Sequence, residues 1–537
     1  MQTAATFSFL RHLAFLRLTG PVFDKEVRMA SRRVRNYVLR AAYVLLMGVF
    51  TISAWYYVVG LRGTRTGVFA VSRAPEIGRH VASQIIWFQL AAAQLIAAVM
   101  LSSSIGDEVR RGTLSLLMTT PIHSAHIVVG KLLSGLLQVV LLLAISLPVL
   151  AILRVLGGVP WGFVLAGFCI ALTASVFAGA LSLLLSTHYR HPSDVISAGI
   201  AVYLLMLAVV PAAAAVLVSA GKLSQPLSSE ILGLINPFRT LHLVDSRAWP
   251  TGSPAGRPVF SWPVHCLTMA AVTGAIVWVS IGRIRRANLA ALSAWAGRSD
   301  CPSATKKKLS RGWKRSDIVA GVVAVAVCAL AVAADASGVR TYGAYLYYFS
   351  WGFWMVALLR LAVSAAGGIT EEKESGTWPV LLTTPLDDDR ILRSKAYAAL
   401  RRNIVLLLSA AAVHVCFMLC ASTSPKALSF GLCVLSAAAS VFFITAAGLY
   451  FGTRLRGTTT AVVVTLGAYL CLNYIVCGQH NPLYGWLLWK IASKGGTGGA
   501  SFMLLAFGMG AAAFVLDTAL GMLLVRRALK NLRHRIF

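Results

Sequence analysis

Residues 112–122 read GTLSLLMTTPI and residues 376–386 read GTWPVLLTTPL, so one eleven-residue pattern occurs twice in the chain. Six of its positions are identical in the two copies. Each copy combines a Gly-Thr pair, a short apolar turn and a Thr-Thr-Pro sequence. The copies lie far apart, one in each half of a chain of 537 residues. Their recurrence indicates an internal duplication, and the rest of the sequence can be divided around them.

The composition is typical of a membrane protein. Of the residues, 58% are hydrophobic and 12% are charged, whereas soluble domains carry roughly 25% charged residues. The N-terminal segment MQTAATFSFLRHLAFLRLTG has Arg11 and Arg17 inside its apolar stretch and no small-residue cleavage site. It therefore does not fit the pattern of a cleaved signal peptide.

Twelve apolar runs are long enough to cross the roughly 30 Å hydrocarbon core of a bilayer. We predict that they are the transmembrane helices of an all-α membrane protein, in two sets of six. The first set lies near 40–60, 83–104, 127–153, 161–186, 194–219 and 263–282. The second set lies near 318–336, 345–367, 397–420, 427–452, 459–477 and 500–525. The external loop 220–262 is predicted to contain an amphipathic, partly re-entrant segment.

Basic residues orient the chain, because the cytoplasmic flanks of membrane helices collect Lys and Arg. With both termini in the cytoplasm, most of the 49 Lys and Arg residues fall in cytoplasmic segments, including the linker 283–315. The external loop 61–82, which carries four Arg residues, is an exception. We attribute the net charge of +31 to this topology and not to nucleic-acid binding.

Other landmarks recur in the same order in the two sets of spans. The corresponding pairs are Lys131 and Lys395, THYR at 187–190 and TRLR at 453–456, and NPF at 236–238 and NPL at 481–483. Because six is an even number, both halves cross the membrane in the same direction. We predict two parallel six-helix repeats, the first formed by residues 1–300 and the second by residues 301–537.

The repeated pattern predicts a helical corner in the cytoplasmic loop between the second and third span of each half. In the first copy, Gly112 suits a left-handed helix end and the hydroxyl of Thr113 can cap the short helix LSLLM. Thr120 can cap a third helix with Pro121 at its first position, where a missing N–H costs nothing. An apolar crosspiece is thereby exposed outside the bilayer, which favours a docking surface.

The second copy predicts the same corner. Thr377 can cap the short helix and Pro379 lies in its tolerated first turn. Thr384 can cap the following helix, with Pro385 after it. The three Asp residues at 387–389 favour the positive N-terminal end of that helix.

The N-terminus predicts an amphipathic helix over residues 21–39, lying on the cytoplasmic face of the membrane before the first span. Apolar residues recur at helical spacing in this segment, namely Phe23, Val27, Ala30, Val34 and Val38. Lys25, Arg28, Arg32 and Arg35 lie mostly away from that stripe.

These features resemble the type 2 class of ABC-transporter permeases, with two half-units fused in one chain. The half-units of that class look like an elbow helix, six spans and a coupling helix between spans two and three. The matching residues of the first copy are Glu108, Gly112, Thr113, Leu117, Thr119, Thr120, Pro121, Gly130 and Lys131. Those of the second copy are Glu372, Gly376, Thr377, Leu381, Thr383, Thr384, Pro385 and Lys395, with Ser394 in place of the Gly. The elbow resemblance rests on GPVFDKEVR and the residues Phe23, Glu26, Val27, Arg28 and Val34.

The resemblance implies a permease subunit, not itself an enzyme, in the bacterial cytoplasmic membrane. It implies an exporter powered by separate cytoplasmic ABC ATPase subunits, two in number, with segments 113–119 and 377–383 inserted into grooves on them. Glu108 and Glu372 would pair with basic residues of those ATPases. ATP and Mg²⁺ would be bound by the ATPases, since the chain has no G-x-x-x-x-G-K-[ST] sequence. The second half has only SRGWKRSD at 310–317 in place of the elbow, so the two docking sites need not be equivalent.

Two other classes remain as alternatives at this point. The first is an ion-coupled secondary carrier with parallel six-span repeats, which would place ionisable groups within the membrane. One candidate is Arg360, which is close enough to the cytosolic end to snorkel. The others are Asp517 and His414, which have no evident partners in the sequence. The second is a membrane-embedded enzyme, for which His123, His126, His188 and His191 could converge. We expect no metal site, because loop histidines are usually solvated and the nine cysteines are scattered.

Overall fold

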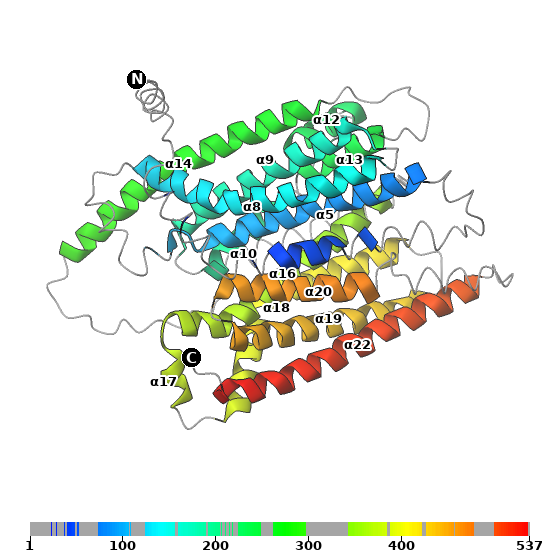
Figure 1. The fold of residues 1–537 in the computed structure, drawn as a ribbon. Helices are drawn as coiled ribbons and strands as arrows, with labels where there is room; N and C mark the ends of the chain where they lie inside the picture. The colour runs from blue at the N-terminus through cyan, green and yellow to red at the C-terminus, as the bar shows by residue number, and fades with distance from the viewer. Residues whose placement is uncertain are drawn as a thin grey trace, which may run out of the picture.

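The computed structural model describes thirteen continuous segments of the chain and eight isolated residues. The segments are 40–48, 51–52, 74–106, 124–155, 159–189, 192–204, 224–248, 261–296, 342–383, 387–421, 426–455, 457–476 and 499–534, and the isolated residues are 23, 28, 37, 108, 206, 210, 214 and 217. Within these parts the regular structure is helical, without a strand (Figure 1). The predicted all-α fold is thus confirmed for the described residues.

The first half of the chain contains four long helices and three shorter ones. They are α5 (Ala74–Ser102), α8 (Ser124–Val155), α9 (Trp161–Ser186), α10 (Pro192–Leu204), α12 (Gln225–Ile235), α13 (Pro237–Ala248) and α14 (Trp262–Ala296). The described residues 210, 214 and 217 beyond α10 are also helical.

The second half contains a similar set. Its helices are α16 (Tyr342–Glu374), α17 (Trp378–Leu382), α18 (Asp388–Ala421), α19 (Lys426–Arg454), α20 (Thr458–Val476) and α22 (Gly499–His534). Several of them extend beyond the predicted spans because polar ends continue the helix past the apolar run.

Six stretches of the described residues are long and apolar enough to cross a membrane. They are Gly78–Ser102, Ser124–Arg154, Trp161–Ser186, Trp262–Ile284, Phe353–Glu374 and Asp388–Val413. Each overlaps a predicted span, and together they make the chain a multi-pass membrane protein. The predicted span near 318–336 and part of the one near 40–60 lie outside the described residues, and the total of twelve stays a prediction.

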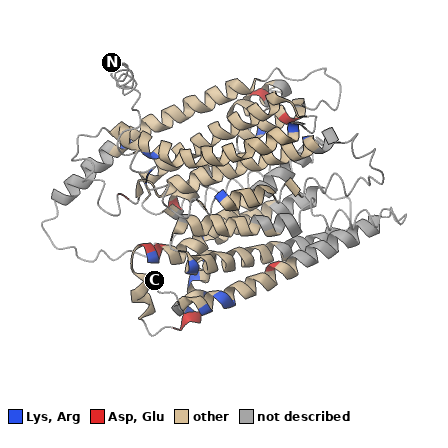
Figure 2. Cartoon of the chain, in the orientation of Figure 1, with Lys and Arg blue, Asp and Glu red and all other residues tan. Residues whose placement is uncertain are grey.

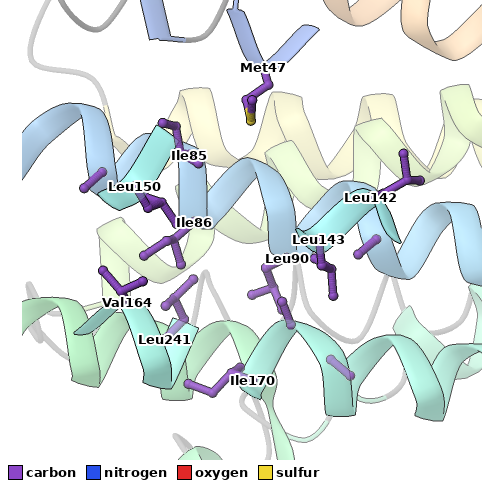
Figure 3. Close-up of a cluster of buried hydrophobic side chains, with 14 of the residues drawn as sticks. Met47, Ile85, Ile86, Leu90, Leu142, Leu143, Leu150, Val164, Ile170 and Leu241 are labelled. Carbon is purple, nitrogen blue, oxygen red and sulfur yellow. The ribbon is translucent and has the colours of Figure 1, made fainter. Parts of the chain in front are cut away.

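The core of the first half lies where α5, α8 and α9 meet. Ile85, Ile86 and Leu90 of α5 share one buried cluster with Leu143 and Leu150 of α8 (Figure 3). Val164 and Ile170 of α9 and Leu241 of α13 belong to the same cluster. Every one of these side chains is at most 4% exposed. The apolar sequences therefore serve helix packing as well as contact with lipid.

Close backbone packing holds α16 to α19 in the second half. A Cβ atom added at Gly448 would lie 2.8 Å from the Cβ of Ala365 and 3.1 Å from the backbone nitrogen of Ala366. One turn further, a Cβ at Gly452 would lie 3.1 Å from the carbonyl oxygen of Ala366. The two glycines thus let the helices approach more closely than larger residues would allow.

The two halves contact each other through helices of both. Val99 of α5 and Ile196 of α10 belong to the same buried cluster as Phe353 and Leu361 of α16. Helix α10 packs against α16, and α20 packs against α5. The interface between the halves is therefore apolar at its centre.

Helices α12 and α13, which lie in the loop predicted to be external, occupy one end of the bundle, and α17 lies toward the opposite end (Figure 1). Asp245 of α13 accepts hydrogen bonds from Ser83 Oγ at 3.0 Å and from Trp87 Nε1 at 3.4 Å, which fastens α13 to the start of α5. The described charged residues gather toward the ends of the helices, while the middle of the bundle carries few of them (Figure 2).

Candidate functional site

The described corner of the second half begins where α16 ends. Gly376 has φ = 73°, the left-handed conformation that glycine adopts without steric cost. Its N–H donates to Lys373 O at 3.3 Å, and the N–H of Thr377 donates to Glu372 O at 3.0 Å. These two bonds are the Schellman arrangement that ends a helix and satisfies its last carbonyls. The predicted left-handed helix end is confirmed at Gly376.

The predicted capping role of the Thr377 hydroxyl is wrong. Thr377 precedes α17, but its side chain makes no capping bond to that helix. The hydroxyl instead lies 2.9 Å from Ser375 Oγ and 3.3 Å from Glu372 O, at the end of the preceding helix. The backbone of Thr377 is in the right-handed helical region, with φ = −85° and ψ = −10°, rather than the extended conformation of a typical capping residue. Pro379 does lie in the first turn of α17, as predicted.

Helix α17 has one anchored side and one exposed side. Trp378 is only 4% exposed and shares a buried cluster with Ile369, Ile391 and Tyr450. Val380 on the same short helix is 67% exposed. Pro379 and Thr383 are exposed as well, whereas Leu381 is half-buried. The tryptophan therefore fixes the helix on the body of the protein while an apolar surface stays open.

An ion pair closes the base of the loop in each half. Lys131 Nζ of α8 lies 3.1 Å from Glu108 Oε1, and Lys395 of α18 pairs with Glu372 of α16. Lys131 also donates to Ser104 O at 2.8 Å. Both lysines follow their glutamate by 23 residues, so the same pair joins the predicted second and third spans of each half.

This pairing was not predicted, although the four residues were recognised as two matching sets. The equal spacing of glutamate and lysine in the two halves was the available signal, because it places both side chains at the same end of two adjacent antiparallel helices. The predicted contact of Glu108 and Glu372 with a partner protein remains a prediction.

Acidic residues mark the start of α18, as predicted. Asp388 and Asp389 lie in its first turn, where the positive end of the helix stabilises negative charge. Asp389 also pairs with Arg393 at 2.6 Å, one turn further along the helix. The exposed end of α18 next to α17 therefore carries charges of both signs.

Several predicted site residues fall outside the described part of the chain. They are Gly112, Thr113, Leu117, Thr119, Thr120 and Pro121 of the first copy, Thr384 and Pro385 of the second, and Glu26, Val27 and Val34 of the N-terminal helix. Phe23 and Arg28 are described and helical, with Phe23 half-buried and Arg28 exposed.

Comparison with protein families identifies the class of this chain. The family described as "ABC-2 family transporter protein" matches residues 21–289 and 352–480, well over half of the sequence. The chain belongs to the ABC-2 transporter family. As an ABC-2 permease it is a transmembrane transport subunit, and members of this family typically pair with ATPase subunits. No curated protein matches the sequence.

The candidate groups for the alternative classes are placed as follows. Arg360 was predicted to reach the cytosolic surface. It is only 5% exposed, because neighbouring helices cover it, so that prediction is wrong. Asp517 has a partner, since Ser440 Oγ donates to its Oδ2 at 3.4 Å. His188 lies 3.0 Å from Arg283 Nη1 through its Nδ1, and His123 and His191 are outside the described residues. Among the residues that the structure places, no three His, Cys, Asp or Glu side chains form a group suited to a metal ion.

Proposed function

We propose that this ABC-2 permease forms the translocation pathway of an ATP-driven exporter and is powered by separate ABC ATPase subunits. The observation that carries the proposal is α17, a short helix held outside the long helices with an exposed apolar face. It lies in the loop between two long helices, and the same sequence pattern occurs at 112–122 in the first half. We infer that segments 113–119 and 377–383 each insert into a groove on one ATPase subunit.

Two parallel halves with cytoplasmic termini fit this function. Helix α5 packs against α8 and α9 as α16 packs against α18 and α19, and the α10–α16 contact has its counterpart in α20–α5. This correspondence supports a duplication of residues 1–300 and 301–537, with the pathway between the halves. ATP and Mg²⁺ are bound by the two ATPases, and this chain holds no cofactor of its own.

The mechanism follows from the position of the corners. When ATP draws the two ATPase subunits together, each subunit pulls on the corner seated in its groove. The Glu–Lys pairs at the base of each loop keep the corner attached to the second and third spans. Closure of the ATPases thereby tilts the two halves as rigid bodies and changes which side of the membrane the pathway opens to.

The docking surface is tested by co-purification of the full-length chain with an ABC ATPase from the same cell. Val380→Arg places a charge on the exposed face of α17, where Val380 is 67% exposed, and Val380→Ile keeps an apolar side chain there. We expect Val380→Arg to reduce the bound ATPase at least tenfold and Val380→Ile to retain it. Undiminished binding by the Arg variant would exclude α17 as the docking helix.

A second experiment addresses the glutamates. Replacing both Glu108 and Glu372 with Ala should uncouple ATP hydrolysis from transport, because the corners lose their attachment to the spans as well as any contact with the ATPase. Unchanged coupling in the double variant would contradict the assignment.

The secondary carrier is less well supported. Such a carrier would use an ionisable group lining the pathway, and the candidates Arg360 and Asp517 are each no more than 5% exposed. ATPase co-purification also separates the two classes, since a secondary carrier binds no ATPase.

A further inference from the structure

Two consecutive residues at the end of α16 contact the turn between α19 and α20. Lys373 Nζ donates to Gly452 O at 2.9 Å and to the carbonyl of Thr453, at the C-terminal end of α19. Glu374 Oε1 accepts a hydrogen bond from the backbone N–H of Thr458 at 2.9 Å, at the N-terminal end of α20. One turn before Glu374 on α16, Thr370 Oγ1 lies 2.7 Å from Thr458 Oγ1 of α20.

These contacts match the charges at the helix ends. The last carbonyls of a helix lack intrahelical donors and carry partial negative charge, which a lysine ammonium satisfies. The first N–H groups of a helix lack acceptors and carry partial positive charge, which a carboxylate satisfies. Lys373 and Glu374 thus serve one helix end each, and both ends belong to the same turn.

The same short stretch of α16 also carries the corner. Glu372 pairs with Lys395 of α18, so residues 372–374 contact α18, α19 and α20 in succession. Gly376 and α17 follow at once. The ammonium of Lys373 lies 5.9 Å from the centre of the ring of Trp378, the residue that fixes α17 on the body of the protein.

We propose that Lys373 and Glu374 are positioning residues that tie the corner of the second half to the α19–α20 turn. A displacement of α17 is thereby transmitted to α19 and α20, in addition to α16 and α18, which are continuous with the corner. This inference rests on the proposed coupling function. It extends that function by naming the contacts through which a motion of α17 reaches α19 and α20.

The sequence of the first half does not repeat the two residues that form this tie. When the two motifs are aligned at Gly112 and Gly376, Val109 and Arg110 stand in place of Lys373 and Glu374. Valine has no donor for carbonyl oxygens, and arginine cannot accept a hydrogen bond from an N–H group. Val109 and Arg110 therefore cannot supply the same donor and acceptor that Lys373 and Glu374 supply in the second half.

The test is hydrogen exchange measured by mass spectrometry on the full-length chain in lipid nanodiscs. The variants Lys373→Met and Glu374→Ala remove the polar contacts, whereas Lys373→Arg and Glu374→Gln keep a donor and an acceptor. We expect the first two to raise amide exchange roughly tenfold both at 457–463 and at 375–383, since one charge-assisted hydrogen bond is lost. The two conservative variants should exchange like the unmodified protein.

Asp389→Ala is the matched control, because it removes a carboxylate at the same corner whose described ion pair lies within α18. It should leave exchange at 457–463 unchanged. The proposal is overturned if Lys373→Met and Glu374→Ala affect 457–463 alone, if neither segment responds, or if the control variant produces the same change.

A second arm separates this inference from the proposed function. In the complex with the ATPase, MgATP should alter exchange at 457–463 in the unmodified chain, and Glu374→Ala should abolish that response while Glu374→Gln keeps it. If the chain binds no ATPase, the proposed function fails, and the measurement on the chain alone still decides whether the tie exists. A nucleotide response that persists in Glu374→Ala would contradict transmission through this contact.

Discussion

Arg402 of α18 and Asp194 of α10 form an ion pair between the two halves of the chain, with Nη2 2.6 Å from Oδ1 across 208 residues of sequence. The side chains are 39% and 21% exposed, respectively. The pair lies beside the apolar contact of Ile196 with the second half, since Asp194 and Ile196 share the first turns of α10. A charged contact therefore supplements apolar packing where the halves meet.

Charge reversal tests this contact between the halves. Arg402→Glu or Asp194→Arg alone should lower the free energy of unfolding by roughly 1 kcal/mol, because a partly exposed ion pair contributes at most about that much. The exchanged pair Arg402→Glu with Asp194→Arg should recover most of the loss. Thermal unfolding of the purified chain in nanodiscs measures all three, and a double variant no better than the sum of the single variants would contradict the pairing.

The buried pair at the first corner should respond differently. Lys131→Met leaves the largely buried carboxylate of Glu108 without its ammonium partner, which should cost about 3 kcal/mol, as breaking buried pairs does. Combining it with Glu108→Leu should restore most of the stability, because two apolar side chains can replace a buried pair at little cost. Chemical or thermal unfolding measures the stability of Lys131→Met and of the double variant. A double variant as unstable as Lys131→Met would mean that the carboxylate is not the source of the cost.

Gly376 allows a substitution that tests backbone conformation alone. Gly376→Ala forces a Cβ into the left-handed region, at a cost of about 1 kcal/mol or slightly more, and should loosen the corner. Gly376→Asn should be better tolerated, because asparagine adopts this conformation more readily than alanine. Limited proteolysis of residues 375–387 reports the loosening, and equal cleavage of the Ala variant and the unmodified chain would argue against a left-handed conformation at residue 376.

The glycines of α16 and α19 provide a matched pair. Gly448→Ala should destabilise the chain by about 1–3 kcal/mol, since the added methyl group meets Ala365 and the backbone of Ala366. Gly368→Ala is the control, because a Cβ there meets nothing within 4 Å. Alanine also favours the helical conformation, so the control should be neutral or slightly stabilising. The melting temperatures of the two variants decide the question, and equal losses would contradict close packing at Gly448.

The predicted helices and the corner depended on local rules that few residues determine. Long apolar runs specified helices such as α9, whose bounds 161–186 agree with the prediction. The glycine of the Gly-Thr pair specified the left-handed turn at Gly376, and the aspartates specified the start of α18 to within a few residues. The Thr377 prediction was wrong because a hydroxyl can bond to either neighbouring helix, and local sequence does not choose between them.

The sequence alone determined the membrane class, the corner at Gly376 and the family, because composition and motif spacing are properties of the chain itself. Only the tertiary structure decided which polar groups meet: Glu108 with Lys131, Lys373 with the end of α19, and Arg402 with Asp194. The physical reason is that membrane helices are apolar on nearly every face, so hydropathy does not fix how they rotate and slide against one another. Close packing at small residues such as Gly448 sets that arrangement, and it brings distant charges within hydrogen-bonding reach.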